Sequence, residues 1–431
     1  MLLIPDIHIN STYKEKIIDA IKEYISSNKD EKNIIFVWDY VYHFSYDRNA
    51  LMMLYNLFLD LFHEWKTVYV LAWNHDWLWD SFVFQEAQKA FEIVNKSNNL
   101  WKIYFVTEPE FFDIEGESFF MLPSFIKMER WKDATDRKSF RGKMERWNEN
   151  NLKEINEQIK ILKESQNKNE QMAGKVNQIL LDFIDKFLTE NPNKNLTVIH
   201  HYYFHNTVFP WQKSRFSYKD IALSEEFLNL KNVRFVSWHL HQSFVFKNYL
   251  CIGSLWSTSP LEVNQVKYFC KLNSDKVDLE QININPYILI DKSLILQNEK
   301  IDEKYIENFY LEILENSQKN FENEDNIWNI KISKNKNLDL KSVNLTIRVP
   351  EIDYKQIDSI IDENLRKSLK DVKLKKESVS IQDLLQDFEV STKNLSTGFA
   401  DWKVILKAYL EKKYQDEYGK YEKVLQELKL I

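Results

Sequence analysis

Short runs of β-branched and aromatic residues, bounded by polar or turn residues, recur through the first 125 residues and again from about 195 to 295. Such runs predict β-strands. In the first region they cover 1–4, 34–37 and 68–72, and residues 13–26 and 49–62 between them carry apolar residues at helical spacing. Strands that alternate with helices in this way predict an α/β sheet.

The second region predicts strands at 196–199, 233–237, 244–252 and 266–272. No long helix separates the last three, so this half is expected to be rich in hairpins.

The remaining segments suggest how the chain divides into domains. Residues 126–190 are polar and rich in Lys, Glu, Asn and Gln, which predicts a helical insertion within a first domain over 1–295. From 296 to 431 the pattern mixes helices, such as 303–317, with a strand at 344–349. We therefore expect a smaller α+β C-terminal domain over 296–431.

Composition narrows the class of protein. The formal net charge is −7, so the bulk charge does not indicate a protein that binds polyanions over its whole surface. Two cysteines cannot make a disulfide framework, and no apolar run approaches the roughly 18 residues that a membrane span needs. We expect a cytoplasmic protein without a membrane partner.

Five small clusters of polar, potentially metal-binding residues each follow a predicted strand. They are Asp6 with His8, Asp39, Asn74 to Asp76, His200 with His201, and His239 with His241. In open α/β sheets, ligands bind beyond the carboxyl ends of the strands, so these five loops are expected to converge on one site.

The residue types in these clusters indicate metal chemistry. Oxygen ligands from Asp and Asn, mixed with imidazole nitrogens, suit Mn, Fe or Zn better than an all-oxygen site for Mg or Ca. Seven candidate ligands exceed what one ion needs. Two ions about 3.5 to 4 Å apart, bridged by a carboxylate, would use all of them and would clamp the attacking and leaving oxygens of a phosphoryl displacement.

The order of the clusters resembles that of the calcineurin-like metallophosphoesterase superfamily, over about residues 1 to 270. The resemblance implies a four-layer sandwich of two mixed β-sheets flanked by helices. It also implies two metal ions, with manganese as the first choice and iron or zinc as alternatives. The implied ligands are Asp6, His8, Asp39, Asn74, His200, His239 and His241. Only one histidine of the pair 200–201 is expected to be a ligand, and His200 is favoured over His201.

The resemblance also implies the catalytic roles. Asp39 would bridge the ions, and His75 would protonate or stabilise the leaving group, oriented by Asp76. The nucleophile would be a metal-bound hydroxide, because a divalent cation lowers the pKa of its water.

At three positions where the family has glycine, this chain has tryptophan. The family has glycine before Asp39, Asn74 and His239, and this chain has Trp38, Trp73 and Trp238. The chain also has only 6 glycines, where average usage gives roughly 30, and 13 tryptophans. These facts suggest that the codon UGA is read as glycine in the source organism and was translated here as tryptophan.

Within the superfamily, the chain is most similar to the SbcD-type DNA exonuclease subunit. The long helix expected at 49–62 and the run Tyr249 to Ser254 after the last motif support this likeness. Eight basic residues between Lys127 and Arg146 are interleaved with aromatic ones, as expected for phosphate contacts with DNA. The candidate contacts are Lys127, Arg130, Arg137, Lys138, Arg141 and Lys143. A solvated amphipathic helix would carry the same pattern.

The SbcD likeness predicts a nuclease of DNA repair and recombination, with DNA and a coiled-coil ATPase of the SbcC type as partners, and a homodimer. Two alternatives remain open. One is a small-molecule or protein phosphatase of the same superfamily. The other is a degenerate, non-catalytic member, if Trp38, Trp73 and Trp238 are genuine.

Overall fold

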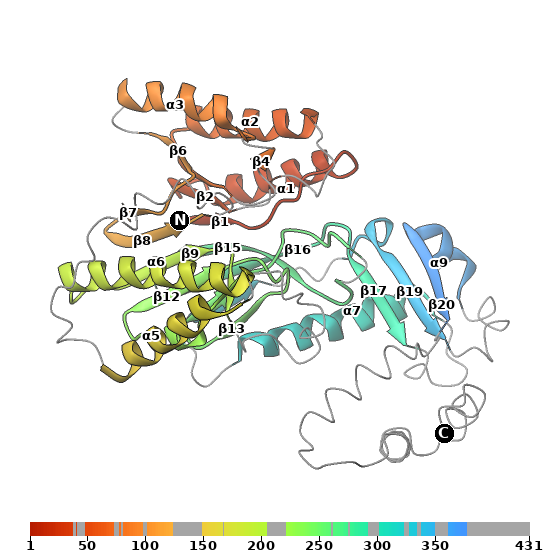
Figure 1. Cartoon of the computed structure of the whole chain (residues 1–431). Helices are drawn as coiled ribbons and strands as arrows, with labels where there is room; N and C mark the ends of the chain where they lie inside the picture. The colour runs from red at the N-terminus through yellow and green to blue at the C-terminus, as the bar shows by residue number, and fades with distance from the viewer. Residues whose placement is uncertain are drawn as a thin grey trace, which may run out of the picture. The chain divides into compact units, whose positions relative to one another are not determined.

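A computed structural model describes most of the chain (Figure 1). The described residues are 1–37, 40, 48–72, 77–78, 81–97, 101–123, 149–166, 168–204, 221–259, 262–274, 276–291, 301–322, 327–333, 338–349 and 361–376. Trp38, Asp39 and the segment from Trp73 to Asp76 lie outside them, as do all six candidate DNA-contact residues.

The first large sheet has seven strands in the order β18-β16-β15-β1-β2-β3-β6. Its parallel half consists of β1 (Leu2–Ile4), β2 (Asn33–Val37), β3 (Thr67–Leu71) and β6 (Ile103–Val106). On the other side of β1, β15 (Lys267–Asn273) pairs antiparallel, followed by β16 (Lys276–Ile282) and β18 (Asn329–Ser333). The central strand β1 is completely buried, as parallel strands covered on both faces usually are.

Three helices cover this sheet because each has a continuous apolar face. They are α1 (Lys14–Ser27), α2 (Arg48–His63) and α3 (Gln85–Ser97). In α1 the buried residues Ile17, Ile18, Ile21, Tyr24 and Ile25 follow the helical repeat, and the Tyr24 ring stacks on Phe269 of β15. The helices expected at 13–26 and 49–62 are confirmed.

The second large sheet has six strands in the order β13-β14-β12-β9-β8-β7. Its strands are β7 (Glu110–Ile114), β8 (Glu117–Leu122), β9 (Leu196–His200), β12 (Val233–Ser237), β13 (Phe244–Phe246) and β14 (Tyr249–Cys251). The run at 244–252, predicted as one strand, forms two short strands instead, β13 and β14, which pair antiparallel as a hairpin. In this sheet β8, β9, β12 and β14 run parallel, so it is also mixed.

Among the described residues between β8 and β9, two helices pack against each other: α5 (Glu149–Glu164) and α6 (Lys168–Glu190). Phe183 and Phe187 of α6 contact Phe111 of β7, so α6 covers this sheet. The helical character expected for 126–190 is confirmed over these two helices, and residues 124–148 lie outside the described part.

The remaining elements are short or lie later in the chain. They are β4 (Trp77–Leu78), β5 (Ser81–Phe82), β10 (Tyr203–Phe204), β11 (Ala222–Leu223), η3 (Glu225–Asn229), β17 (Tyr287–Asp291), α7 (Glu303–Gln318), η5 (Lys319–Phe321), η6 (Leu340–Ser342), β19 (Asn344–Val349), α9 (Glu363–Ser368) and β20 (Asp371–Lys376). Strands β17, β19 and β20 form a three-stranded sheet.

The chain divides into two compact units. The larger contains Met1–Arg348 and Lys355–Lys375, and the other contains Val349–Tyr354 and Lys376–Ile431. Residues 301–348, which the sequence pattern assigns to a C-terminal domain, belong to the larger unit, and β18 extends its first sheet. Nearly all of the smaller unit lies outside the described residues. Among the helices that the structure describes, none is both long and apolar enough to cross a membrane.

Candidate metal centre

Asp6 and His8 follow the carboxyl end of β1, at the middle of the first sheet. Asp6 is completely buried, and its backbone forms an isolated parallel bridge with Ser254, where its carbonyl accepts from the N–H of Leu255 at 2.9 Å. The backbone of His8 has φ of +43°, a conformation that few non-glycine residues adopt. The Trp256 indole Nε1 donates to the Ile7 carbonyl between these two residues at 2.7 Å. The loop after β1 is thus held by the loop after β14.

His241 reaches the same place from the second sheet. It closes a turn after β12, in which its N–H donates to the Trp238 carbonyl at 3.0 Å, and its φ is +53°. Two histidines at positive φ in one site is unusual, because such conformations are sparsely populated and tend to occur where function requires them.

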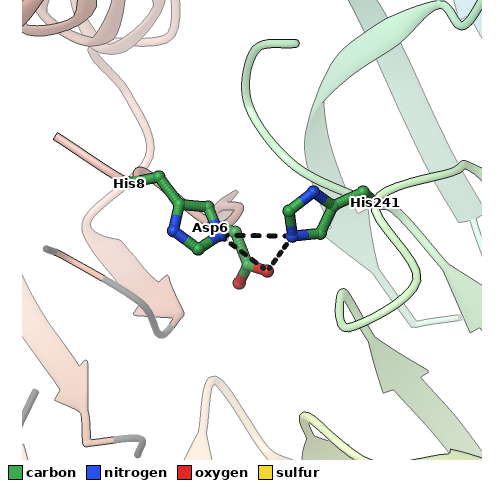
Figure 2. Close-up of side chains that lie close together, drawn as sticks. All are labelled: Asp6, His8 and His241. Atoms are coloured by element: carbon green, nitrogen blue, oxygen red, sulfur yellow. Dashed lines mark hydrogen bonds and ion pairs between the residues drawn. The ribbon is translucent and has the colours of Figure 1, made fainter. Parts of the chain in front are cut away.

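Asp6, His8 and His241 form a cluster that fits a metal ion (Figure 2). The Nε2 atoms of the two histidines are 3.2 Å apart, and each lies 3.9 Å from Oδ2 of Asp6. Ligand atoms 2.0 to 2.2 Å from one ion, at tetrahedral or octahedral angles, are separated by about 2.8 to 3.6 Å. The three side chains need to move only slightly to share an ion.

A third histidine, His201, lies beside the other oxygen of Asp6. Nδ1 of His201 is 3.4 Å from Oδ1 of Asp6, and the rings of His201 and His239 have centroids 4.9 Å apart. The structure therefore places His201 on the Oδ1 side of Asp6, with His239 next to His201, and places His8 and His241 on the Oδ2 side.

His200 is placed differently from its neighbour. Its ring is completely buried and lies among the rings of Phe204, Phe235 and Tyr249. Burial lowers the pKa of His200 to about 3, and the neighbouring His201 contributes in the same direction. The structure brings His201 and not the favoured His200 to Asp6. Side chains alternate between the two faces of a strand, so adjacent residues at the end of β9 point in opposite directions.

Glu262 has no counterpart among the sequence-predicted residues. Its Oε1 lies 3.0 Å from Nδ1 of His241, and its Oε2 accepts from the Lys267 ammonium at 2.6 Å. Burial alone would raise the pKa of the Glu262 carboxyl, but the charge of Lys267 and the hydrogen bonds from Lys267 and His241 hold this pKa well below its ordinary value. The carboxylate beside His241 is therefore ionised at neutral pH.

Trp238, the tryptophan before His239, does not have the positive φ that would favour glycine at this position. Trp238 is completely buried, and it is not among the described residues with positive φ. The steric argument for glycine is therefore not supported at this position, while Trp38 and Trp73 lie outside the described residues. Gly253 does need to be glycine. Its φ is +81°, and a Cβ there would lie 2.6 Å from the His241 carbonyl oxygen.

Asp39, Asn74, His75 and Asp76 remain sequence predictions, because they lie outside the described residues. Comparison of the sequence with protein-family models finds no match, and comparison with curated proteins finds none.

Proposed function

We propose that this chain is a metallophosphoesterase of the calcineurin-like type, which holds two divalent cations and hydrolyses phosphodiester bonds in DNA. The observation that carries the proposal is the convergence of Asp6, His8 and His241 from the ends of two different sheets. His241 lies 233 positions after His8 in the chain, and each of the three residues belongs to a motif of the predicted family.

The two histidine groups support a site for two ions rather than one. His8 and His241 lie beside Oδ2 of Asp6, and His201 lies beside Oδ1 with His239 next to it. In this proposal Asp39 and Asn74, which follow β2 and β3 in the sequence, would complete the set of residues that holds the two ions. His75 and Asp76 act on the leaving group.

The ions supply the positive charge that a phosphoryl displacement needs at its attacking and leaving oxygens. Manganese is the favoured metal, with iron and zinc as alternatives, because the donor set mixes imidazole nitrogen with carboxylate oxygen. In the same proposal, the two mixed sheets with their helices form the four-layer sandwich of this family.

DNA is proposed as the substrate from the sequence alone. The basic segment from Lys127 to Arg146 supplies phosphate contacts, and an SbcC-type ATPase is the proposed partner. A role in DNA repair or recombination follows from this reading, with a phosphatase as the alternative function.

Manganese-dependent degradation of linear duplex DNA tests the proposal. We expect activity that EDTA abolishes and Mn²⁺ restores, and that Asp6→Asn and His241→Ala each lower at least about 100-fold, because each removes a metal ligand. His63→Ala is the matched control, since His63 is exposed at the end of α2 and belongs to none of the five clusters. Failure of the purified protein to bind Mn²⁺ would contradict the proposal.

A second set of assays distinguishes the nuclease from the phosphatase and tests the recoding of UGA. The assay is repeated with glycine at 38, 73 and 238, with a simple phosphate monoester beside the DNA, and with His75→Ala as an inactive control. Degradation of DNA only by the glycine version would support the recoding of UGA. Hydrolysis of the monoester without DNA degradation would assign the chain to the phosphatases.

A further inference from the structure

The His241 ring is held from both of its nitrogens. Nε2 faces His8 and Asp6, at 3.2 Å and 3.9 Å, and Nδ1 faces Oε1 of Glu262 at 3.0 Å. The Thr258 hydroxyl also lies 3.4 Å from Nδ1. One edge of the ring therefore belongs to the candidate metal centre, and the other edge to a separate polar network.

That network is buried and built around one ion pair. Glu262 and Lys267 are 5% and 2% exposed, and Nζ of Lys267 donates to Oε2 of Glu262 at 2.6 Å. Oε1 of Glu262 also accepts from the backbone N–H and the hydroxyl of Thr258. A buried ion pair is costly unless its remaining groups are satisfied, and here both partners make further hydrogen bonds.

Lys267 also fixes the backbone that carries His241. Its ammonium donates to the His241 carbonyl at 2.7 Å and to the Ser254 hydroxyl at 2.9 Å. The same carbonyl lies against Gly253, where any side chain would collide with it. The ring and the backbone of His241 are therefore both held in position by residues that follow β14 in the chain.

The protonation of the ring follows from these contacts. A carboxylate paired with an ammonium group is ionised and only accepts hydrogen bonds. Nδ1 of His241 must then carry a proton, so in the neutral ring the lone pair lies on Nε2, which faces Asp6 and His8. This is the tautomer that a histidine ligating through Nε2 requires.

We propose that Glu262 is a positioning residue, which holds His241 in the Nδ1–H tautomer with Nε2 directed at the metal ion, and that Lys267 holds Glu262 in place. The proposal rests on the metal centre proposed above, but its central claim concerns the protein without metal or DNA. It therefore remains testable if the nuclease assignment fails.

The first test measures the tautomer directly. Long-range ¹H–¹⁵N spectra of the metal-free protein, with the His241 signals assigned by their loss in His241→Gln, are expected to show Nδ1 protonated and Nε2 unprotonated. Glu262→Gln is expected to give a mixture of both tautomers. A wild-type protein with Nε2 protonated in His241 would overturn the proposal, whatever its enzymatic activity.

The second test measures Mn²⁺ affinity by calorimetry, without nucleic acid. Glu262→Gln is expected to weaken binding about 10- to 100-fold, the usual effect of removing a partner that orients a metal ligand. Glu262→Asp keeps a charge for Lys267 but is one methylene too short to reach Nδ1, so it is expected to weaken binding as well. Unchanged affinity in both folded variants would overturn the proposal.

Glu31→Gln is the matched control. Glu31 pairs with Lys271 at 2.6 Å, the same separation as in the Glu262 pair, but its side-chain partners among the described residues are Lys271 and the N-terminus rather than Asp6, His8 or His241. We expect its Mn²⁺ affinity to equal that of the wild type. If Glu262→Gln does not fold, the double change Glu262→Gln with Lys267→Met removes both charges and carries the same expectations. Absence of Mn²⁺ binding by the wild type would contradict the proposed function, while the spectra would still decide the tautomer.

Discussion

At the scale of single residues, the histidine pair at the end of β9 shows what a pattern can and cannot predict. Two adjacent histidines after a strand indicate a site, but they do not indicate which of them faces it. His201 lies beside Asp6, while His200 is buried among aromatic rings. Which face of β9 points to the site depends on the packing of the whole sheet, so no local signal separates the two.

This placement leads to a prediction about metal binding. His201→Ala is expected to weaken Mn²⁺ binding at one of two sites about 100-fold, because it removes a ligand. His200→Phe is expected to leave Mn²⁺ affinity nearly unchanged, because that ring occupies an apolar environment. Titration of both variants by calorimetry provides the comparison. If a folded His200→Phe protein lost more Mn²⁺ affinity than His201→Ala, the placement of His201 beside Asp6 would be contradicted.

Residues that act through a ligand were harder to predict than the ligands. Asp6, His8 and His241 follow strands within recognisable motifs, and their convergence was predicted from that position alone. Glu262 and Lys267 belong to no motif and follow the last histidine by more than twenty residues. Their role depends on three-dimensional contacts, which the spacing of residues does not encode.

At the scale of elements, the end of α2 has a backbone that suits glycine. Trp65 has φ of +67°, its N–H donates to the Phe62 carbonyl, and the Lys66 N–H donates to the Leu61 carbonyl. These paired bonds form a Schellman motif, in which the residue at positive φ is usually glycine. The Trp65 side chain is 61% exposed, so little packing offsets the strain.

We therefore expect Trp65→Gly to stabilise the protein by about 1 kcal/mol, the typical cost of a left-handed conformation in a non-glycine residue. The edge contact of its ring with Trp101 offsets a part of this gain. Urea denaturation provides the measurement. Trp256→Gly is the contrast, since that buried indole donates to Ile7, and its loss is expected to cost about 3 to 5 kcal/mol.

A lower urea midpoint for Trp65→Gly than for the wild type would contradict this account.

A related measurement bears on the translation of UGA. If the recoding hypothesis holds, the native peptide that contains position 65 has the mass of glycine there, whereas peptides containing Trp256 keep the mass of tryptophan. The structure thus separates positions that suit glycine from those that use the indole.

The elements themselves were predicted well where their pattern was local. The helix expected at 49–62 spans Arg48–His63, and the strand expected at 34–37 spans Asn33–Val37. Pairing between distant strands was not predicted. β18 adds to β16 in parallel, and β17 pairs with β19, although nothing in these short strands specifies their neighbours.

At the scale of the whole molecule, each large sheet contains one buried cysteine. Cys251 lies in β14 of the six-stranded sheet, and Cys270 lies in β15 of the seven-stranded sheet. Both are completely buried, and burial raises the pKa of Cys251 to about 12 and that of Cys270 further. Neither thiol is ionised at pH 8, so neither is reactive in the folded protein.

The two thiols can therefore report on the unfolding of each sheet. In Cys251→Ala and Cys270→Ala proteins, the remaining thiol is expected to react with a disulfide reagent at pH 8 only when denaturant unfolds its sheet. Equal midpoints in the two variants are expected, since both sheets belong to one compact unit. Rapid labelling of either thiol without denaturant would contradict the burial described above.

The bridge between Asp6 and Ser254 also has a consequence for protein synthesis. The loop after β1 leaves the ribosome before its supporting groups do, because strand β15, Trp256 and the ion pair that holds His241 all follow residue 250. An unfinished chain therefore contains Asp6 and His8 without the groups that fix them. For an enzyme proposed to cut DNA, hydrolytic activity would begin only after the chain had been translated beyond Lys267.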